Sequence, residues 1–141
     1  MFRISTRGKY ALITMEVLAE QNDRAFVPMK KISQKQNLSV KYLEQILIQL
    51  SKAGLVEGLR GNNGGYRLVK PPKEYTAGEI LRAMEGNLSP GGINEEKTVK
   101  TKGNEEFWQG FDKTVNEYVD SITLEKIMEK SKETDGYMFY I

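Results

Sequence analysis

The pattern of apolar residues predicts that the chain enters a helix almost at once, from an expected N-cap at Thr6 to about Gln21. Positions spaced i, i+3, i+4, i+7 and i+8 form one stripe that is expected to be buried, made of Tyr10, Ile13, Thr14, Val17 and Leu18. A second apolar stripe is made of Leu12, Met15 and Ala19. A helix that is apolar on two sides needs two partners. One is the core of its own domain, and the other is either a second element or a second subunit.

Two further helices, separated by a tight turn, are predicted over residues 29–36 and 40–53. Ser39 is a good N-cap for the second of them, and Gly54 supplies the left-handed residue that ends it. Its apolar face holds Val40, Leu43, Ile46, Leu47, Leu50 and Ala53, and its polar face holds Lys41, Gln45, Gln49 and Lys52. Ile48 interrupts the polar face, and it either meets a thymine methyl group or packs on a neighbour.

A β-hairpin is predicted from an alternating strand over residues 55–60, a turn rich in glycine and asparagine over 61–65, and a returning strand over 66–69. Two consecutive prolines end the second strand. A capping box then opens a further helix over residues 76–85. The predicted fold class is therefore mainly α with a small β-hairpin wing.

Residues 86–103 lack apolar periodicity and are expected to form a mobile loop before a long helix over residues 104–121. Apolar residues in this helix and directly after it are spaced 3-4-3-4, as in the seam of a coiled coil. They are Trp108, Phe111, Val115, Tyr118 and Ile122. Such a stripe covers either the chain's own core or a second subunit. Because about 18 helical residues span ~27 Å, more than a small head can cover, a dimer interface is favoured. Thr123 is expected to cap a short helix to Lys130, before Asp135-Gly136 turns into the tail.

The order helix, short helix, tight turn, helix and hairpin defines a winged helix-turn-helix over residues 1–75. Residues 76–141 then form a linker helix, a loop, a dimerisation helix, a short helix and a tail. Residues 1–76 carry 13 Lys and Arg against 6 Asp and Glu, whereas residues 77–141 carry 8 against 13. A basic head on an acidic arm is typical of a nucleic-acid-binding unit joined to a protein-facing one. We therefore predict that the head binds double-stranded DNA.

The predicted DNA contacts come from three places. The recognition helix offers the residues after its N-cap to base edges in the major groove, where Lys reads guanine and Gln pairs with adenine. The hairpin reaches phosphates or the minor groove, and basic residues flank the N-terminus of the first helix, which is a ready phosphate site. The residues are Arg3, Ser5, Thr6, Arg7 and Lys9 at the first helix, Ser39, Lys41, Tyr42 and Gln45 on the recognition helix, and Arg60, Asn62, Asn63, Gly64, Gly65 and Tyr66 on the hairpin, with Arg67 as a further candidate there.

The chain contains no cysteine and no histidine. Disulfides, thiolate metal sites, cysteine-ligated iron–sulfur clusters and thiol switches are thereby excluded, and the usual general base is missing. No nucleophile–base pair or metal-ligand spacing is found, so an enzyme is disfavoured and no cofactor or metal is expected. No apolar run approaches the ~20 residues that span a bilayer, and the N-terminus lacks a signal-peptide core, so we expect a cytoplasmic protein.

Several segments resemble the Rrf-type bacterial transcriptional regulators, and among them most nearly those that repress cysteine metabolism. The family motifs are Ile4-Ser5-Thr6-Arg7-Gly8-Lys9-Tyr10-Ala11, Leu38-Ser39-Val40-Lys41-Tyr42-Leu43-Glu44-Gln45-Ile46-Leu47, Gly54-Leu55-Val56 and Arg60-Gly61-Asn62-Asn63-Gly64-Gly65-Tyr66. The likeness to the cysteine-metabolism type covers Thr76-Ala77-Gly78-Glu79-Ile80, Glu85-Gly86-Asn87-Leu88-Ser89-Pro90 and Tyr137-Met138-Phe139-Tyr140-Ile141.

This resemblance implies a homodimer held by the long helix, with two heads on a pseudo-palindromic operator. Cluster-binding members carry three cysteines in the loop that matches residues 86–103, and this chain has none there. The resemblance also implies a complex with the cysteine-synthesising enzyme O-acetylserine thiol-lyase, in which Tyr140 and Ile141 dock with the terminal carboxylate in place of the substrate's. The alternative is a tail that packs its aromatic rings on the dimer or frays.

Two classes of function remain after these exclusions. The first is a sequence-specific transcriptional regulator, a repressor that occupies a promoter and so controls genes of cysteine and sulfur metabolism. The second is a non-catalytic interaction module that acts through the C-terminal tail on a metabolic enzyme. A steep salt dependence of DNA affinity, together with discrimination between one operator and random DNA, distinguishes the first from the second.

Overall fold

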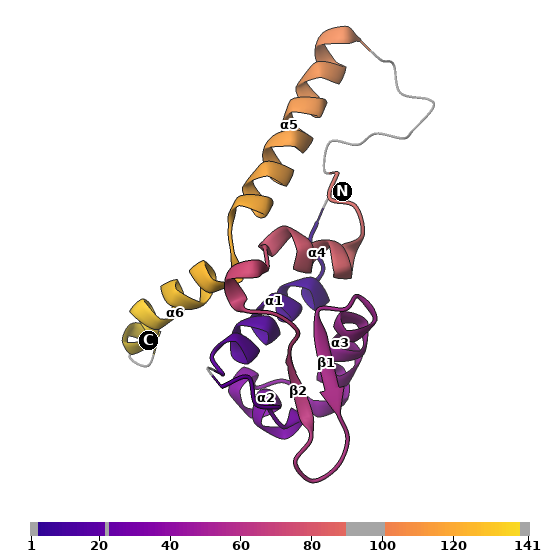
Figure 1. Ribbon diagram of the computed structural model, residues 1–141. Helices are drawn as coiled ribbons and strands as arrows, with labels where there is room; N and C mark the ends of the chain where they lie inside the picture. The colour runs from indigo at the N-terminus through magenta and orange to yellow at the C-terminus, as the bar shows by residue number, and fades with distance from the viewer. Residues whose placement is uncertain (1–2, 22, 90–100, 139–141) are drawn as a thin grey trace.

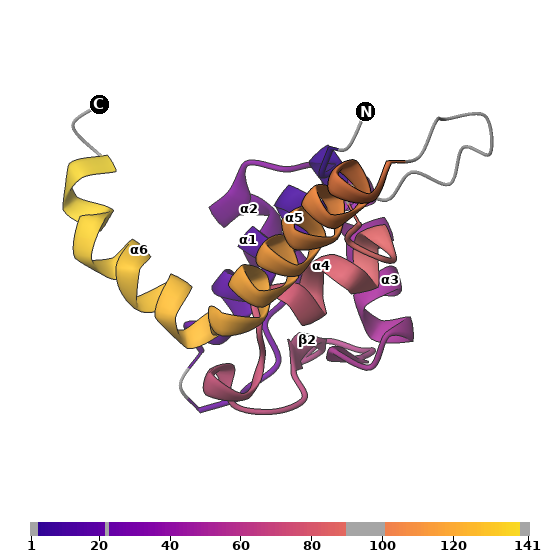
Figure 2. The same ribbon diagram turned by 90° about the horizontal axis from the view of Figure 1, so that it is seen from above.

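The computed structural model describes residues 3–21, 23–89 and 101–138 (Figure 1). Its elements are α1 (Thr6–Ala19), α2 (Met29–Gln36), α3 (Val40–Lys52), β1 (Val56–Leu59), β2 (Gly65–Leu68), the 3₁₀ helix η1 (Pro72–Glu74), α4 (Ala77–Glu85), α5 (Lys102–Ser121) and α6 (Leu124–Met138). The first three helices gather around the hairpin, while α5 projects away from them and α6 turns off in another direction (Figures 1 and 2). This order confirms the predicted winged helix-turn-helix. In the described part of the chain, no helix is long and apolar enough to cross a membrane.

Helix α1 lies at the centre of the head, where it contacts α2, α3, α4, α6 and β2. Its buried residues are Gly8, Ala11, Thr14, Met15, Leu18 and Ala19. The Thr14 hydroxyl donates to the Tyr10 carbonyl oxygen at 2.8 Å and accepts from the Gln36 amide at 2.8 Å, so this buried polar group is paired. The predicted burial of Ile13 is wrong, because the neighbouring helices cover the side of α1 that carries Ala11 and Met15. The Ile13 side chain is left 43% exposed.

The turn between α2 and α3 forms as predicted. Asn37 takes the left-handed conformation with φ of 53°, and the Ser39 hydroxyl accepts from the Tyr42 N–H at 3.2 Å to cap α3. Gly54, with φ of 77°, follows the end of α3. The buried face of α3 consists of Leu43, Ile46, Leu47 and Leu50. Val40, which was expected on this face, is 45% exposed because it lies in the first turn, at the edge of the head.

The wing is the antiparallel hairpin β1–β2, in which Leu59 pairs with Gly65. Val27 adds a third, one-residue strand: its N–H donates to the Tyr66 carbonyl at 2.8 Å, and its carbonyl accepts from the Tyr66 N–H at 2.9 Å. A Cβ atom at Gly65, whose φ is 146°, would overlap the Val27 carbonyl oxygen, and one at Gly64 would overlap that of Leu59. Both glycines are therefore needed for the backbone of the wing to close.

The segment after the wing is anchored by Tyr75, whose side chain is fully buried. Its hydroxyl donates to the Leu55 carbonyl at 2.6 Å and accepts from the Val69 N–H at 2.9 Å. Burial raises the pKa of the Tyr75 hydroxyl above its usual value of 10, so the group stays neutral. The Tyr75 carbonyl accepts from the Leu124 N–H at 3.0 Å. The core of the head therefore continues into α4 and α6, where Ile80, Leu124 and Met128 belong to it.

Two helix boundaries near the C-terminus differ from the prediction. The hydroxyl of Thr101 accepts from the Asn104 N–H at 3.3 Å, so Thr101 caps α5 and the helix begins two residues earlier than expected. Thr123 opens α6 as predicted, but that helix continues to Met138. The expected turn at Asp135-Gly136 is wrong, because Lys and Glu before it favour helix and one isolated glycine does not end it.

Helix α5 is fixed to α4 by the guanidinium group of Arg82. It donates to both carboxylate oxygens of Asp120, at 2.6 and 3.0 Å, and to the Asn116 side-chain oxygen at 2.6 Å. The Asn116 amide in turn donates to the Leu88 carbonyl at 2.6 Å. The hydrogen bonds from Arg82 hold the pKa of Asp120 below its usual 3.8. A bidentate ion pair therefore sets the position of α5 on the head.

Replacing Arg82 by Ala is expected to lower the free energy of unfolding by about 0.5–1 kcal/mol at neutral pH, since the pair is largely exposed. Because the folded-state pKa of Asp120 is lowered, this contribution is present above pH 3.8 and is lost as the pH falls through the folded value. Urea denaturation at pH 7 and at pH 2.5 measures it. An equal difference between Arg82→Ala and the parent chain at both pH values would contradict the assignment.

Candidate DNA-binding surface

The N-terminal half of α3 presents polar side chains to solvent. Lys41 and Gln45 are exposed, Tyr42 is half-buried, and Ser39 caps the helix. Because the opposite face of α3 lies in the core, these side chains are carried on a rigid element. Ile48 is 42% exposed, so part of its side chain is accessible on this face.

Two side chains from the first turns of α1 contact this part of α3. The Arg7 guanidinium donates to the Gln45 side-chain oxygen Oε1 at 3.2 Å. The rings of Tyr10 and Tyr42 meet edge to face, with centroids 5.9 Å apart and an angle of 82° between their planes. A predicted phosphate-binding residue and a predicted base-reading residue are thus joined directly.

The N-terminus of α1 already holds the carboxylate of Glu85, the last residue of α4. The Ser5 N–H donates to Glu85 Oε1 at 2.7 Å, and the Ser5 hydroxyl donates to the same oxygen. Ser5 also accepts from the Gly8 N–H at 3.0 Å, so Ser5 rather than Thr6 is the N-cap. The helix end that was expected to be a free phosphate site is therefore occupied by an anion of the same chain. The predicted contacts that remain exposed around it are Arg3, Thr6, Arg7 and Lys9.

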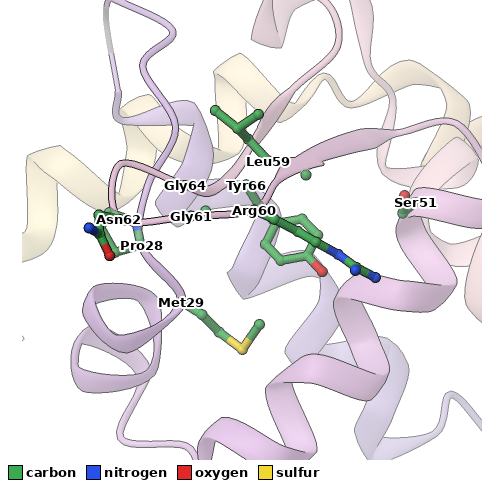
Figure 3. A pocket seen from close by; sticks show the side chains of 11 residues that line it. Pro28, Met29, Ser51, Leu59, Arg60, Gly61, Asn62, Gly64 and Tyr66 are labelled. Atoms are coloured by element: carbon green, nitrogen blue, oxygen red, sulfur yellow. The ribbon is translucent and has the colours of Figure 1, made fainter.

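The tip of the wing carries Arg60, Asn62 and Asn63, all exposed. Between the wing and the helices α2 and α3 lies an open cleft of about 500 Å³. Figure 3 shows Met29 pointing into this cleft from α2, while Arg60 extends across it from the wing toward the end of α3 that carries Ser51. The wing and the recognition helix thus border one concave surface, which includes the exposed side chain of Arg60.

Three predicted wing contacts are also part of the wing's own framework, namely Gly64, Gly65 and Tyr66. Gly64 is buried, and Tyr66 is half-buried along the cleft. Arg67, the further wing candidate, donates to Glu57 at 2.6 Å and lies 4.3 Å over the ring of Phe26. Its charge is therefore engaged by Glu57 and Phe26, whereas Arg60 is the exposed arginine of the wing and extends across the cleft.

The described residues cover the apolar seam predicted on α5 only in part, and no residue of α5 is buried. Phe111 is 43% exposed and Tyr118 is 66% exposed. The other predicted members, Trp108, Val115 and Ile122, are half-buried. Phe107, 59% exposed, extends the seam, and its ring centroid lies 4.8 Å from that of Trp108. The seam is therefore not part of the core that the described residues form.

Sequence reasoning missed three residues of these surfaces: Glu85, Tyr10 and Phe107. Glu85 meets Ser5 across 80 positions of sequence, and no local pattern signals such a contact. Tyr10 was assigned to the core, although its ring also supports Tyr42. Phe107 lies four residues before Phe111, a helical spacing that could have placed it on the seam. Tyr140 and Ile141, predicted to dock in a partner enzyme, lie outside the described residues.

An exposed recognition helix beside a wing with an exposed arginine defines a winged-helix DNA-binding regulator of transcription. Residues 4–130 match the Rrf2 family, whose description is iron-dependent transcriptional regulator, and the chain belongs to this family. It is therefore a transcriptional regulator and not an enzyme. The resemblance carried by the sequence motifs is confirmed.

Individual relatives agree with this assignment. The chain is 40% identical over 140 residues to the HTH-type transcriptional regulator CymR of Bacillus subtilis (strain 168), covering 99% of each chain. The structure of CymR (YrzC), the global cysteine regulator of that organism, matches with a TM-score of 0.82 and 39% identity over 92% of this chain and 98% of the other. T. potens IscR matches with a TM-score of 0.77 and 34% identity, over 99% and 97% of the two chains.

Proposed function

We propose that this regulator is a homodimeric repressor of cysteine and sulfur metabolism genes that reads a pseudo-palindromic operator. The proposal rests on the presence of two separate exposed surfaces in one chain. One is the apolar seam on α5, and the other is the polar face of α3 that is proposed to read DNA. The similarity to CymR over the whole chain supports the class of genes. Residues 1–75 act as the reading head, and residues 76–141 link and pair two heads.

Within each head, Lys41, Tyr42 and Gln45 of α3 face base edges in the major groove. Arg60, Asn62 and Asn63 of the wing reach phosphates or the minor groove, and the exposed basic residues around α1 bind phosphates. Ser5 contributes to DNA binding by capping α1. The wing residues Gly64, Gly65 and Tyr66 contribute by holding the shape of the wing. The division follows the general geometry of winged-helix recognition, in which phosphate contacts position the protein and base contacts select the sequence.

Regulation does not pass through an iron–sulfur cluster in this proposal, although the family description names iron. The chain has neither cysteine nor histidine, which supply the usual ligands of such clusters. O-acetylserine thiol-lyase remains the proposed partner, with Tyr140 and Ile141 as the docking residues. Calorimetric titration of the enzyme with the full chain and with a chain lacking the last two residues tests this. Equal affinity for both would rule out docking through the tail.

The reading roles predict distinct effects for two substitutions on α3 and α1. Lys41→Ala is expected to cost about 1–3 kcal/mol of operator binding and to relax preference at one position of each half-site. Lys9→Ala is expected to weaken binding to all DNA alike and to lower the salt slope by about one. Anisotropy titrations on the operator and on random DNA, from 50 to 200 mM salt, measure both. Identical behaviour of the two variants on all sequences would show that readers and phosphate contacts are wrongly assigned.

The same titrations test DNA reading as a whole. A dimer that makes ~6–10 phosphate contacts should lose about 10³–10⁵ in affinity over this salt range while still preferring its operator. No discrimination at any salt concentration would favour the alternative, an interaction module that acts through its tail.

A further inference from the structure

The first turn of α1 has the hydrogen bonds of a capping box, but the carboxylate comes from another helix. In a capping box, the N-cap hydroxyl accepts from the N–H of the third helical residue, and a Glu or Gln at that residue accepts from the N-cap N–H. Ser5 makes the first bond, because its hydroxyl accepts from the Gly8 N–H at 3.0 Å. For the second bond, the Ser5 N–H donates at 2.7 Å to Glu85, which lies 80 positions further along the chain.

Gly8 stands where a capping box carries its own Glu or Gln, and its missing side chain leaves that place to Glu85. A Cβ atom on Gly8 would lie 2.3 Å from Glu85 Oε1 and 3.2 Å from the carboxyl carbon. The first of these distances is far too short for atoms that are not bonded. A side chain on Gly8 and the bound carboxylate of Glu85 therefore exclude each other, and the glycine and the distant glutamate together replace one local residue.

The turn that is capped in this way carries basic residues that are proposed to bind phosphates. Arg7 and Lys9 are exposed on it, and Arg7 contacts Gln45, which places the turn beside the recognition helix. The Lys9 N–H donates to the Ser5 carbonyl at 3.1 Å. A helix end that loses its cap frays, because its backbone N–H groups lose their partners. The apparent affinity for DNA then falls with the fraction of heads in which the turn is ordered.

We infer that Glu85 is a positioning residue for DNA binding, because it completes the cap of α1 from α4 and so holds the phosphate-binding residues of the first turn in place. The inference rests on the proposed function, in which those residues contact DNA. It makes the affinity of the head depend on a residue outside the predicted reading head of residues 1–75.

The test uses four full-length variants that all lack one carboxylate and therefore carry the same net charge. Glu85→Gln keeps an acceptor on α4, whereas Glu85→Ala removes it. The variant Gly8→Gln/Glu85→Ala supplies the acceptor from α1 itself, because Gln also completes a capping box and the place of the carboxylate is vacated. Its matched control is Gly8→Ala/Glu85→Ala, which removes the same glycine from the helix without adding an acceptor.

Affinities are measured at one salt concentration for random DNA and for an operator selected from random DNA. Glu85→Gln should bind both about 2- to 30-fold more tightly per head than Glu85→Ala, the range that corresponds to a lost helix cap. Gly8→Gln/Glu85→Ala should exceed its control by a factor in the same range. In the free protein, the Lys9 amide should exchange its hydrogen faster in Glu85→Ala than in Glu85→Gln. Because Glu85 is half-buried, each variant should keep the helical circular dichroism of the parent chain.

Equal DNA affinities of Glu85→Gln and Glu85→Ala would overturn the inference, and so would the absence of any gain of Gly8→Gln/Glu85→Ala over its control. Equal exchange of the Lys9 amide in the two Glu85 variants would also overturn it. Failure of the proposed function is recognised separately, because the parent chain would then fail to distinguish an operator from random DNA. The exchange measurement needs no DNA, so it decides in that case too whether Glu85 caps α1.

Discussion

Replacing Phe111 by Asp is expected to convert the proposed dimer into monomers and to lower operator affinity by about 10²–10⁴-fold. The side chain lies in the exposed aromatic cluster of α5, where the ring centroids of Phe107, Trp108 and Phe111 are 4.8–6.3 Å apart. A carboxylate there would be buried without a partner in the proposed dimer. A monomer binds a single half-site and loses the high effective concentration of the second head. Sedimentation and anisotropy titration at micromolar protein measure the two effects.

Gln109→Asp is the matched control for this variant. It introduces the same charge on α5, two residues away and on the side of the helix that faces away from the seam. It should leave both the dimer and the operator affinity unchanged. Since Phe111 is 43% exposed, the Phe111→Asp chain should keep its helical circular dichroism. A folded Phe111→Asp chain that remains a dimer would refute the α5 interface.

Replacing Tyr75 by Phe is expected to lower the free energy of unfolding by about 2–4 kcal/mol. The ring and its packing are retained, but the Leu55 carbonyl and the Val69 N–H lose their partner at 2.6 and 2.9 Å. Each polar group left unpaired in the interior costs about 1–3 kcal/mol. Urea denaturation at equal protein concentration measures the change, which should shift the midpoint without altering the slope.

Tyr66→Phe is the comparison for the effect of a hydroxyl alone. It removes the same group from a half-buried ring along the wing cleft, and a change within about 0.5 kcal/mol is expected. If Tyr75→Phe were no more destabilising than Tyr66→Phe, the buried hydroxyl would not anchor the segment between the wing and α4.

Features with a local cause could be predicted from the sequence. Ser39 and Gly54 define the ends of α3 because a cap and a left-handed glycine act within one turn of the helix. The glycine and asparagine turn defines the hairpin in the same way. The seam of α5 also follows from spacing alone, and the structure leaves Phe111 and Tyr118 exposed.

Features that depend on distant residues could not be predicted. Arg7 and Gln45 are 38 positions apart, and Ser5 and Glu85 are 80 positions apart. Both contacts arise because α1 packs against α3 and α4, which no periodicity reveals. The exposure of Ile13 has the same origin, since hydropathy shows that a helix has apolar stripes but not which stripe its neighbours cover. The sequence therefore predicted which residues form the candidate DNA-binding surface, but not which of them contact one another.

Selection of bound sequences from random double-stranded DNA by the purified chain tests directly whether the protein reads DNA as a pair of heads. We expect enrichment of two inverted half-sites whose centres lie about one helical turn, ~34 Å, apart, or a multiple of that spacing. Enrichment of a single unpaired half-site, or of no sequence at all, would contradict it.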